Sequence, residues 1–209
     1  GQNQPIIYMS RKLHKERSLV ILKPDAVQRG LIGEITKRFE QTGLKCAAMK
    51  MFRANEDLLF KHYNKNEEWF LKKGAGIIED LKSHGLPIDK EPIEYGKDII
   101  RANAISMSSA PVVAMIWEGN QAVAVIKKIV GTTEPASSDV GTIRGDYTVD
   151  SYTHSSYENR AVRNLVHCSD EPSEAEREIE LWFKDTEIMD YVTAQERIMY
   201  DVNFDSVPD

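Results

Sequence analysis

The sequence is poor in cysteine and has no hydrophobic run of membrane-spanning length. Two of its 209 residues are cysteine, Cys46 and Cys168, and their spacing matches neither a disulfide framework nor a zinc site. We therefore expect a reducing compartment. No apolar run approaches about 20 residues, the length of a transmembrane helix, and no signal-peptide pattern occurs. These absences predict a cytoplasmic protein that does not contact membranes.

The sequence also lacks an excess of positive charge. It has 27 Lys and Arg against 33 Asp and Glu, a formal net charge of −6, which argues against a nucleic-acid binder. Any phosphate binding must therefore be local, through a few cations in a cleft. Hydrophobic residues make up 41% of the chain, enough for one core. We predict a single domain over residues 17–200, an N-terminal arm over 1–16 and a tail over 201–209.

No glycine-rich phosphate loop follows any predicted strand, which disfavours a doubly wound parallel sheet. Buried runs and alternating patterns predict strands at 19–22, 45–52, 111–117 and 161–166. Helix signals predict helices from 31 to a stop at Gly43, after an N-cap at Asn55, from 120 to a stop at Gly131, and from a capping box at 173–176 to about 183. This order fits βαββαβ, an α+β sandwich whose four-stranded antiparallel sheet is faced by helices.

Two segments look like insertions into this pattern. Residues 72–103 contain a helical half that ends at Gly85, followed by Pro87, Pro92 and many charges. Residues 149–158 are polar and rich in Ser and Tyr. Both have the composition of loops or satellite helices, without a core of their own.

The strongest candidate for chemistry is His167, at the end of the predicted fourth strand. Apolar residues precede it, Asn164 lies three positions earlier, and a polar turn follows, so the ring is expected at a cleft. A neutral imidazole can attack phosphorus through one nitrogen if the other donates to an orienting group. Glu178 on the next helix is the expected partner. Ser169 either fixes that carboxylate or helps to turn the chain.

The other four histidines are weaker candidates. His14, His84 and His154 lie in polar segments, where we expect them to be solvated. His62 shares a helical turn with Tyr63, and it either lines a cleft or is exposed; the sequence does not separate these two interpretations.

Several residues are suited to bind phosphate oxygens. Lys23 directly follows the buried run 19–22. A lysine that served only solubility would not be expected at this position. Arg144 and Thr133 lie in one polar loop, although Thr133 could also cap a turn, and Lys127 is either a ligand or ordinary helix surface. A cation about 4 Å from a phosphate charge gains roughly 4 kcal/mol at an effective dielectric near 20, before desolvation. Two or three such residues are enough for phosphoryl transfer.

Six motifs in register resemble nucleoside diphosphate kinase. The resemblance covers about residues 17–71, 104–148 and 160–200, in the family's order. The motifs are Lys23-Pro24-Asp25, residues 28–34, residues 111–115, Trp117-Glu118-Gly119, residues 141–146, and Asn164-Leu165-Val166-His167-x-Ser169-Asp170. Several motifs together are far more specific than one. The family's ferredoxin-like fold agrees with the predicted order of strands and helices.

The resemblance implies a ping-pong reaction that depends on Mg²⁺. A nucleoside triphosphate, mainly ATP, gives its γ-phosphate to His167, and the phosphohistidine passes it to a nucleoside diphosphate. Glu178 falls on the carboxylate that orients the histidine, and Asn164 on a position that, with the lysine, contacts the sugar hydroxyl. The family's phosphate-site positions fall on Lys23, Tyr63, Lys127, Thr133 and Arg144.

The resemblance also implies an aromatic ring that stacks on the base, which here is Phe70 or Trp69. Stacking tolerates any base, so broad nucleotide specificity is expected. Two positions depart from the family pattern: Cys168 replaces glycine after the histidine, and Lys127 replaces arginine, which loses a bidentate fork but keeps the charge. A redox role for Cys168 has little support, because buried thiols are usually inert.

The family usually assembles as hexamers, sometimes as tetramers or dimers, so we expect a homo-oligomer with the hexamer favoured. Apolar residues near the end of the chain could pack on a neighbouring subunit or on their own core. Two other functions remain to be compared with kinase activity. One is a nucleotide sensor on the same fold; the other is a histidine-dependent phosphatase or phosphodiesterase, for which no second acid or metal cluster stands out.

Overall fold

The computed structural model describes residues 13–205 and 207 of the chain, so most of the predicted N-terminal arm lies outside the described residues. Its strands form one antiparallel sheet in the order β2-β3-β1-β4. They are β1 (Arg17–Leu22), β2 (Lys45–Phe52), β3 (Val112–Glu118) and β4 (Val166–Cys168). This is the predicted ferredoxin-like α+β sandwich, and the antiparallel pairing rules out a doubly wound parallel sheet.

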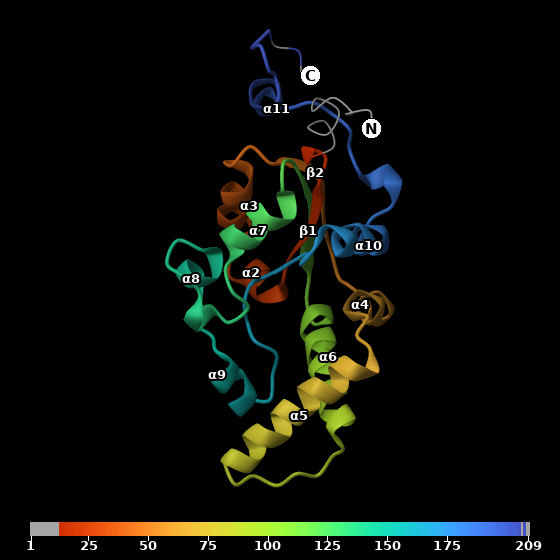
Figure 1. Cartoon of the computed structure of the whole chain (residues 1–209), viewed down its shortest axis with the longest axis vertical. Coiled ribbons are helices and arrows are strands. Elements are labelled where there is room, and N and C mark those ends of the chain that lie inside the picture. The colour runs from red at the N-terminus through yellow and green to blue at the C-terminus, as the bar shows by residue number, and fades with distance from the viewer. Residues whose placement is uncertain (1–12, 206, 208–209) are drawn as a thin grey trace, which may run out of the picture.

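Helices cover both faces of the sheet (Figure 1), which explains why residues 19–22 of β1 are apolar without a break. Leu19 and Ile21 belong to the core on one face, and Val20 and Leu22 to the core on the other, because successive side chains of a strand point to opposite faces. The helices on the Val20 face are α2 (Pro24–Gln28), α3 (Ile32–Glu40), α7 (Ala122–Val130) and α8 (Ile143–Tyr147). Those on the Leu19 face are α4 (Glu56–Tyr63), α6 (Pro92–Ser108) and α10 (Pro172–Trp182).

Three of the predicted helix signals are confirmed. The side chain of Asn55 caps α4 by accepting a hydrogen bond of 2.9 Å from the backbone of Leu58. The stop glycines Gly43 and Gly131 have φ of 92° and 96°, values that glycine adopts without strain.

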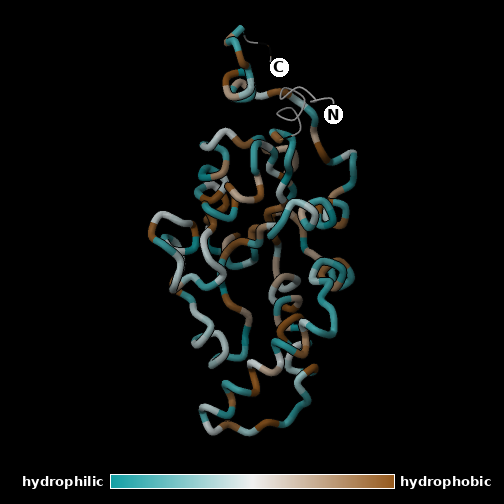
Figure 2. Tube along the Cα trace, viewed as in Figure 1, coloured by the Kyte–Doolittle hydropathy of each residue, from teal (hydrophilic) through white to brown (hydrophobic). Residues whose placement is uncertain are grey.

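The first insertion forms a helical hairpin of α5 (Glu67–Ser83) and α6. Hydrophobic and hydrophilic segments alternate along both helices (Figure 2). The backbones of α5 and α6 are in contact at glycine residues, which have no side chain to separate them. A Cβ on Gly74 would lie 1.6 Å from the carbonyl oxygen of Pro92, and one on Gly96 would lie 2.1 Å from that of Phe70. Of the two alternatives left open for this segment, loops or satellite helices, the structure shows helices over most of it.

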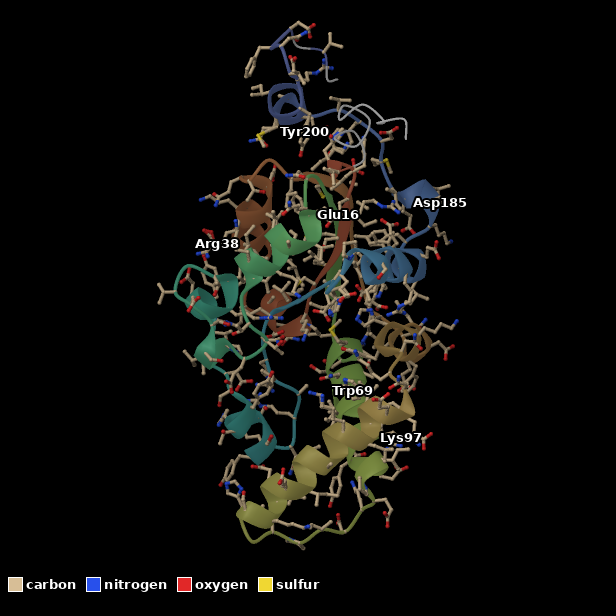
Figure 3. The ribbon with its side chains drawn as sticks, viewed as in Figure 1. Glu16, Arg38, Trp69, Lys97, Asp185 and Tyr200 are labelled. Carbon is tan, nitrogen blue, oxygen red and sulfur yellow. The ribbon has the colours of Figure 1, made fainter. Side chains whose placement is uncertain are left out.

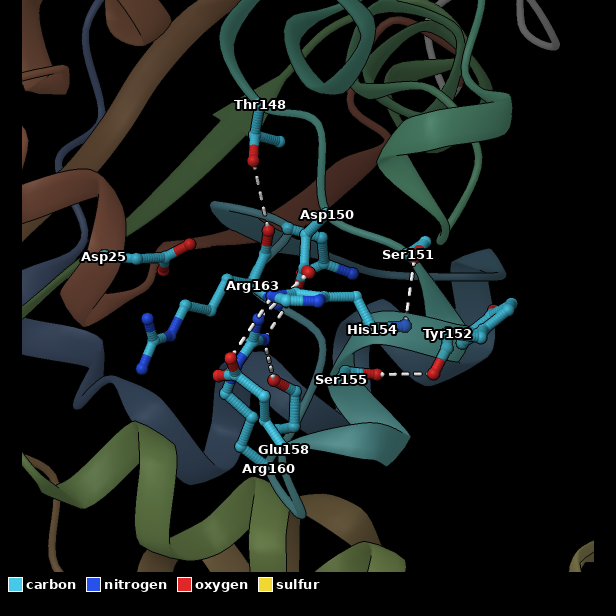
Figure 4. A network of polar contacts seen from close by, with 12 residues as sticks. Asp25, Thr148, Asp150, Ser151, Tyr152, His154, Ser155, Glu158, Arg160 and Arg163 are labelled. Carbon is cyan, nitrogen blue, oxygen red and sulfur yellow. Dashed lines mark hydrogen bonds and ion pairs between the residues drawn. The ribbon is translucent and has the colours of Figure 1, made fainter.

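The second insertion carries a short helix, α9 (Tyr152–Tyr157), which a polar network fixes to the rest of the chain (Figure 4). The carboxylate of Asp150 accepts hydrogen bonds from the guanidinium of Arg160 (2.7 and 3.1 Å) and from the backbone of Arg163 (2.7 Å). Burial acts to raise the pKa of Asp150, but these hydrogen bonds outweigh it and lower the pKa to about 2.

Two predicted boundaries are wrong. The fourth strand was expected at 161–166, but β4 covers Val166–Cys168. Leu165 has a φ of 70°, a left-handed conformation that interrupts an extended strand. The predicted capping box at 173–176 is also wrong. Helix α10 begins at Pro172, a favoured first helical residue, and its N-cap is Glu171 without a side-chain hydrogen bond.

The last part of the chain folds back on the end of the sheet. The short helix α11 (Ala194–Met199) is opened by a capping box of Thr193 and Glu196. The ammonium of buried Lys45 lies 3.0 Å from the carboxylate of Glu196 and donates a 2.7 Å hydrogen bond to the carbonyl of Tyr191. The remaining short helices are η1 (Pro135–Ser137) and η2 (Asp185–Glu187). In the described part of the chain, no helix combines the length and the apolar character that crossing a membrane requires.

Candidate active site

His167 lies within β4, opposite Ile21 of β1, rather than after the strand as its sequence suggested. Its Nε2 is 2.7 Å from Oε2 of Glu178 on α10. The histidine side chain is 24% exposed and that of Glu178 is 5% exposed. Burial acts to raise the pKa of Glu178, but the hydrogen bond from His167 lowers it more. The carboxylate is therefore ionised, Nε2 of His167 carries the proton, and Nδ1 keeps its lone pair.

Ser169 lies two residues after the histidine and is fully buried. Its hydroxyl oxygen accepts a 3.0 Å hydrogen bond from the amide of Leu19. It also helps to lower the pKa of Glu178, while Oε1 of that carboxylate has no hydrogen-bond partner among the described residues. Both interpretations from the sequence therefore have support: Ser169 ties the chain to β1 and acts electrostatically on Glu178.

Lys23, at the exit of β1, meets Asn164, at the entrance of the neighbouring strand β4. The ammonium of Lys23 donates a 2.8 Å hydrogen bond to Oδ1 of Asn164, and the Asn164 amide donates to the carbonyl of Thr133 at 2.9 Å. Burial lowers the pKa of Lys23 to about 8, and the nearby Arg144 guanidinium adds to this effect. The Thr133 side chain itself is exposed.

Arg144 is buried at the start of α8, where Thr142 caps the helix. It donates from Nε to the carbonyl of Asn164 (3.0 Å), from Nη1 to Gly131 (3.1 Å) and from Nη2 to Val166 (2.5 Å). A guanidinium has five N–H groups, so two remain for a ligand. Burial lowers the pKa of Arg144, but an arginine stays charged at neutral pH.

Lys127 lies further out than the other cations. Its side chain is 48% exposed, and its ammonium donates a 3.3 Å hydrogen bond to the carbonyl of Asp170, in the turn after β4. Beside it, burial raises the pKa of the Cys168 thiol to about 11. A thiol that stays protonated at neutral pH is a poor nucleophile.

The two aromatic candidates for base stacking lie side by side near the start of α5, with Trp69 labelled in Figure 3. Their ring centroids are 5.7 Å apart and the rings are nearly perpendicular. The ammonium groups of Lys65 and Lys73 lie 5.4 and 5.8 Å from the Trp69 ring. Phe70 sits at the contact between α5 and α6. Both side chains are partly buried, so the two alternatives remain open.

His62, which the sequence left undecided, is buried at 4% exposure in the same cluster. Its Nδ1 accepts a 3.0 Å hydrogen bond from the indole of Trp182, and its ring centroid is 4.5 Å from that of His167. The neighbouring Tyr63 ring is 4.9 Å from His62, and burial raises its pKa well above the usual value. Nothing near His62 in the chain indicates this burial, because Trp182 is 120 residues away.

Asp25 was not among the residues predicted for the site, although it belongs to the Lys23 motif. Its carboxylate accepts a 3.1 Å hydrogen bond from the amide of Leu165, and the carbonyl of Leu165 accepts one of 2.9 Å from the amide of Lys23. These two contacts hold Leu165 in its left-handed conformation directly before the strand of His167.

One group of side chains has the composition of a metal site. A ring nitrogen of His62, a ring nitrogen of His167 and an oxygen of Glu178 lie within 4.8 Å of one another. Nε2 of His167 already shares a hydrogen bond with Glu178, and Nδ1 of His62 already accepts one from Trp182. We therefore describe this group as a hydrogen-bonded cluster.

An imidazole held by a buried carboxylate, on a ferredoxin-like sheet that also positions the cations Lys23 and Arg144, has the composition that phosphoryl transfer requires. The family model of nucleoside diphosphate kinase matches residues 16–81 and 94–188. The chain belongs to that family. The unmatched residues 82–93 join α5 to α6.

Individual relatives agree with the family model. A nucleoside diphosphate kinase of Pyrobaculum aerophilum is 46% identical over 180 residues, covering 84% of this chain and 98% of the relative. The crystal structure of an NDP kinase from the same organism has a TM-score of 0.79 at 44% identity, covering 84% of this chain and all of that one. A nucleoside-diphosphate kinase from Borrelia burgdorferi, a transition-state mimic with bound vanadate and ADP, has a TM-score of 0.72 at 32% identity, covering 88% of this chain and 96% of that one.

This chain is therefore a nucleotide-binding phosphotransferase that carries out the nucleoside diphosphate kinase reaction. The γ-phosphate of a nucleoside triphosphate is transferred to a nucleoside diphosphate. The comparisons thus favour the kinase over the nucleotide sensor and the phosphatase considered from the sequence.

Proposed function

We propose that Nδ1 of His167 is the atom that accepts the γ-phosphate. The 2.7 Å bond between Nε2 and Glu178 supports this proposal most directly, because it uses one ring nitrogen and leaves the other with its lone pair. A bond forms between Nδ1 and the γ-phosphorus while the bond to the bridging oxygen breaks, and the nucleoside diphosphate leaves. A terminal phosphate oxygen of a second diphosphate then attacks the phosphohistidine and restores the free imidazole.

Glu178 stabilises the positive charge that the ring gains when Nδ1 forms its bond. A carboxylate beside an imidazole favours the charged ring, and the fixed Nε2–H also holds the ring in one orientation. Because Glu178 is almost fully buried, water screens this interaction little. Ser169 supports the same carboxylate.

The phosphate chain is held by the cations that the fold gathers. Lys23 and the two unused N–H groups of Arg144 face the transferring phosphoryl group, where charge spreads over its oxygens. The remaining phosphates of the nucleotide are bound by Lys127, Tyr63 and Thr133. Asn164, paired with Lys23, contacts the sugar hydroxyl, and Phe70 or Trp69 stacks on the base.

Mg²⁺ enters this site as part of the substrate. It prefers oxygen ligands, keeps several of its waters and binds readily to nucleotide phosphates. The carboxylates of Asp25 and Glu178 are engaged with Leu165 and His167, so the nucleotide's own phosphates would supply oxygens to the ion. The ion neutralises charge on those phosphates during transfer.

Residues 17–200 act as one domain in a cytoplasmic homo-oligomer, with the hexamer favoured. Apolar side chains remain exposed at the end of the sheet and on α11, among them Met49 and Met51 of β2 and Ile198 and Met199, which are between 49% and 63% exposed. Exposed apolar groups of this kind mark association surfaces. Light scattering of the purified chain measures the number of subunits.

The experiment that tests the proposed function uses γ-labelled ATP without an acceptor. The chain is expected to form an acid-labile phosphoprotein that disappears when a diphosphate is added. His167→Ala removes the label, whereas His154→Ala, a change at an exposed histidine of α9, keeps it. Steady release of free phosphate, or label that persists in His167→Ala, would reject the proposal.

A further inference from the structure

His62 has no part in the reaction described above, yet it is buried against the nucleophile. Its ring meets that of His167 edge to face, with the planes at 77°. Its Nδ1 lies 3.5 Å from the same oxygen of Glu178 that His167 uses. Two imidazoles therefore approach one buried carboxylate, and a hydrogen bond from either would compete with the other.

The indole of Trp182 decides this competition. An indole N–H can only donate, and it donates to Nδ1 of His62 at 3.0 Å. Nδ1 of His62 must then be an acceptor, so its proton is on Nε2 and the ring is neutral. A nitrogen lone pair and a carboxylate oxygen cannot hydrogen-bond each other. Nδ1 of His62 therefore makes no hydrogen bond to Glu178, although the two atoms are 3.5 Å apart.

We infer that Trp182 and His62 are positioning residues that reserve Glu178 for His167. By keeping Nδ1 of His62 an acceptor, the indole leaves the carboxylate with one imidazole partner. The orientation of the His167 ring and its hydrogen bond to the Glu178 carboxylate then depend on Trp182 and His62. The inference deepens the proposed function and rests on His167 as the phosphate acceptor.

The charges around His62 act in the same direction. Burial lowers its pKa well below the usual value, and the neighbouring His167 ring and the positive groups of Arg177, Lys23 and Lys65 add to the effect. These groups come from β4, α10, the exit of β1 and the segment after α4. Glu178 is the charge that would favour a protonated His62, and the Trp182 hydrogen bond opposes that outcome.

Trp182→Phe tests the inference, because it removes the indole N–H and keeps an aromatic ring. Nδ1 of His62 can then take a proton and donate it to Glu178. A proton on Nδ1 in addition to the one on Nε2 makes the ring positively charged, and this form is more abundant at lower pH. The ratio of kcat/KM at pH 6 to that at pH 8 is therefore expected to fall relative to the unmodified chain.

Two further variants keep this test decisive. Trp117→Phe is the matched control, because Trp117 is also buried but its indole N–H has no acceptor among the described residues; its ratio should equal that of the unmodified chain. In the double variant Trp182→Phe with His62→Phe no second imidazole remains, and the ratio should return. NMR titration of the His62 ring in folded Trp182→Phe reports the protonation directly, and far-UV circular dichroism of the same sample checks the fold.

An unchanged ratio in Trp182→Phe, or a lowered ratio that persists in the double variant, would overturn the inference. Labelling of His167 by ATP separates this failure from that of the proposed function. If the phosphoprotein forms and the ratio does not move, His167 is the acceptor and the role assigned to Trp182 and His62 is wrong.

Discussion

The ammonium of Lys23 and the amide oxygen of Asn164, 141 residues apart in the chain, lie 2.8 Å from each other. The contact joins the exit of β1 to the segment that enters β4. The lysine is thereby held near Arg144, and burial lowers its pKa to about 8. The cation most directly placed to bind phosphate is therefore one that titrates in an accessible pH range.

This titration predicts a loss of activity on the alkaline side. Lys23 is charged below pH 8 and becomes neutral as the pH rises through that value, so kcat/KM for ATP should fall above pH 8. This parameter reports ionisation in the free enzyme. In Lys23→Arg the charge persists at all accessible pH values. The variant should lose the alkaline fall even where its overall activity is lower. A flat profile in the unmodified chain would argue against the assignment.

The helical hairpin α5–α6 depends on glycine at its contacts. Gly74→Ala should lower the free energy of unfolding by more than about 1 kcal/mol, because the new Cβ meets backbone that cannot yield. Gly76→Ala is the matched control: nothing lies within 4 Å of its Cβ position, and alanine should stabilise the helix by up to about 1 kcal/mol. Urea unfolding of both variants checks these signs. Equal effects would show that the helices do not touch at Gly74.

The same hairpin presents Trp69 and Phe70, and their alanine variants decide which ring stacks on the base. Stacking is worth about 1–3 kcal/mol per base, so the substitution of the stacking residue should raise the Kd for ADP at least fivefold. The other substitution should change it little. Equal losses with ADP, GDP and CDP are expected for the stacking ring, and no loss in either variant would exclude both positions.

Asp150 ties the second insertion to the segment that leads to Asn164. Its pKa is about 2 in the folded chain, below the ordinary 3.9 of an unfolded aspartate. The group therefore contributes stability above pH 4, and this contribution is lost as the pH falls from 4 to 2. Asp150→Asn should cost about 2 kcal/mol at pH 7 and little at pH 2.

Asp139→Asn, at an exposed position, is the control for Asp150→Asn. Thermal unfolding at both pH values measures the difference. A cost for Asp150→Asn that is the same at pH 7 and pH 2 would show that the charge of Asp150 is not what matters.

The parts of this molecule that depend on local sequence could be predicted from it. The apolar run of β1 indicates a strand buried on both faces, and the cap at Asn55 and the stop at Gly131 mark helix ends because their chemistry is local. The residues gathered around the nucleophile were also named from the sequence: the structure brings Lys23, Arg144 and Asn164 beside the pair of His167 and Glu178.

Features fixed by distant contacts could not be predicted. The start of β4 is displaced because Asp25 and Lys23 hold Leu165 in a left-handed conformation. The burial of His62 follows from a donor on α10. The sequence around Leu165 indicates a strand and the sequence around His62 indicates a helix. Neither pattern shows which distant residue makes the contact.

The proposal that Nδ1 of His167 accepts the γ-phosphate is tested by finding which ring nitrogen carries the phosphate. The labelled phosphoprotein is digested under alkaline conditions, and the phosphohistidine isomer is identified by NMR. With Nε2 bound to Glu178, phosphate is expected on Nδ1 of His167. Phosphate on Nε2, or on a residue other than His167, would contradict it.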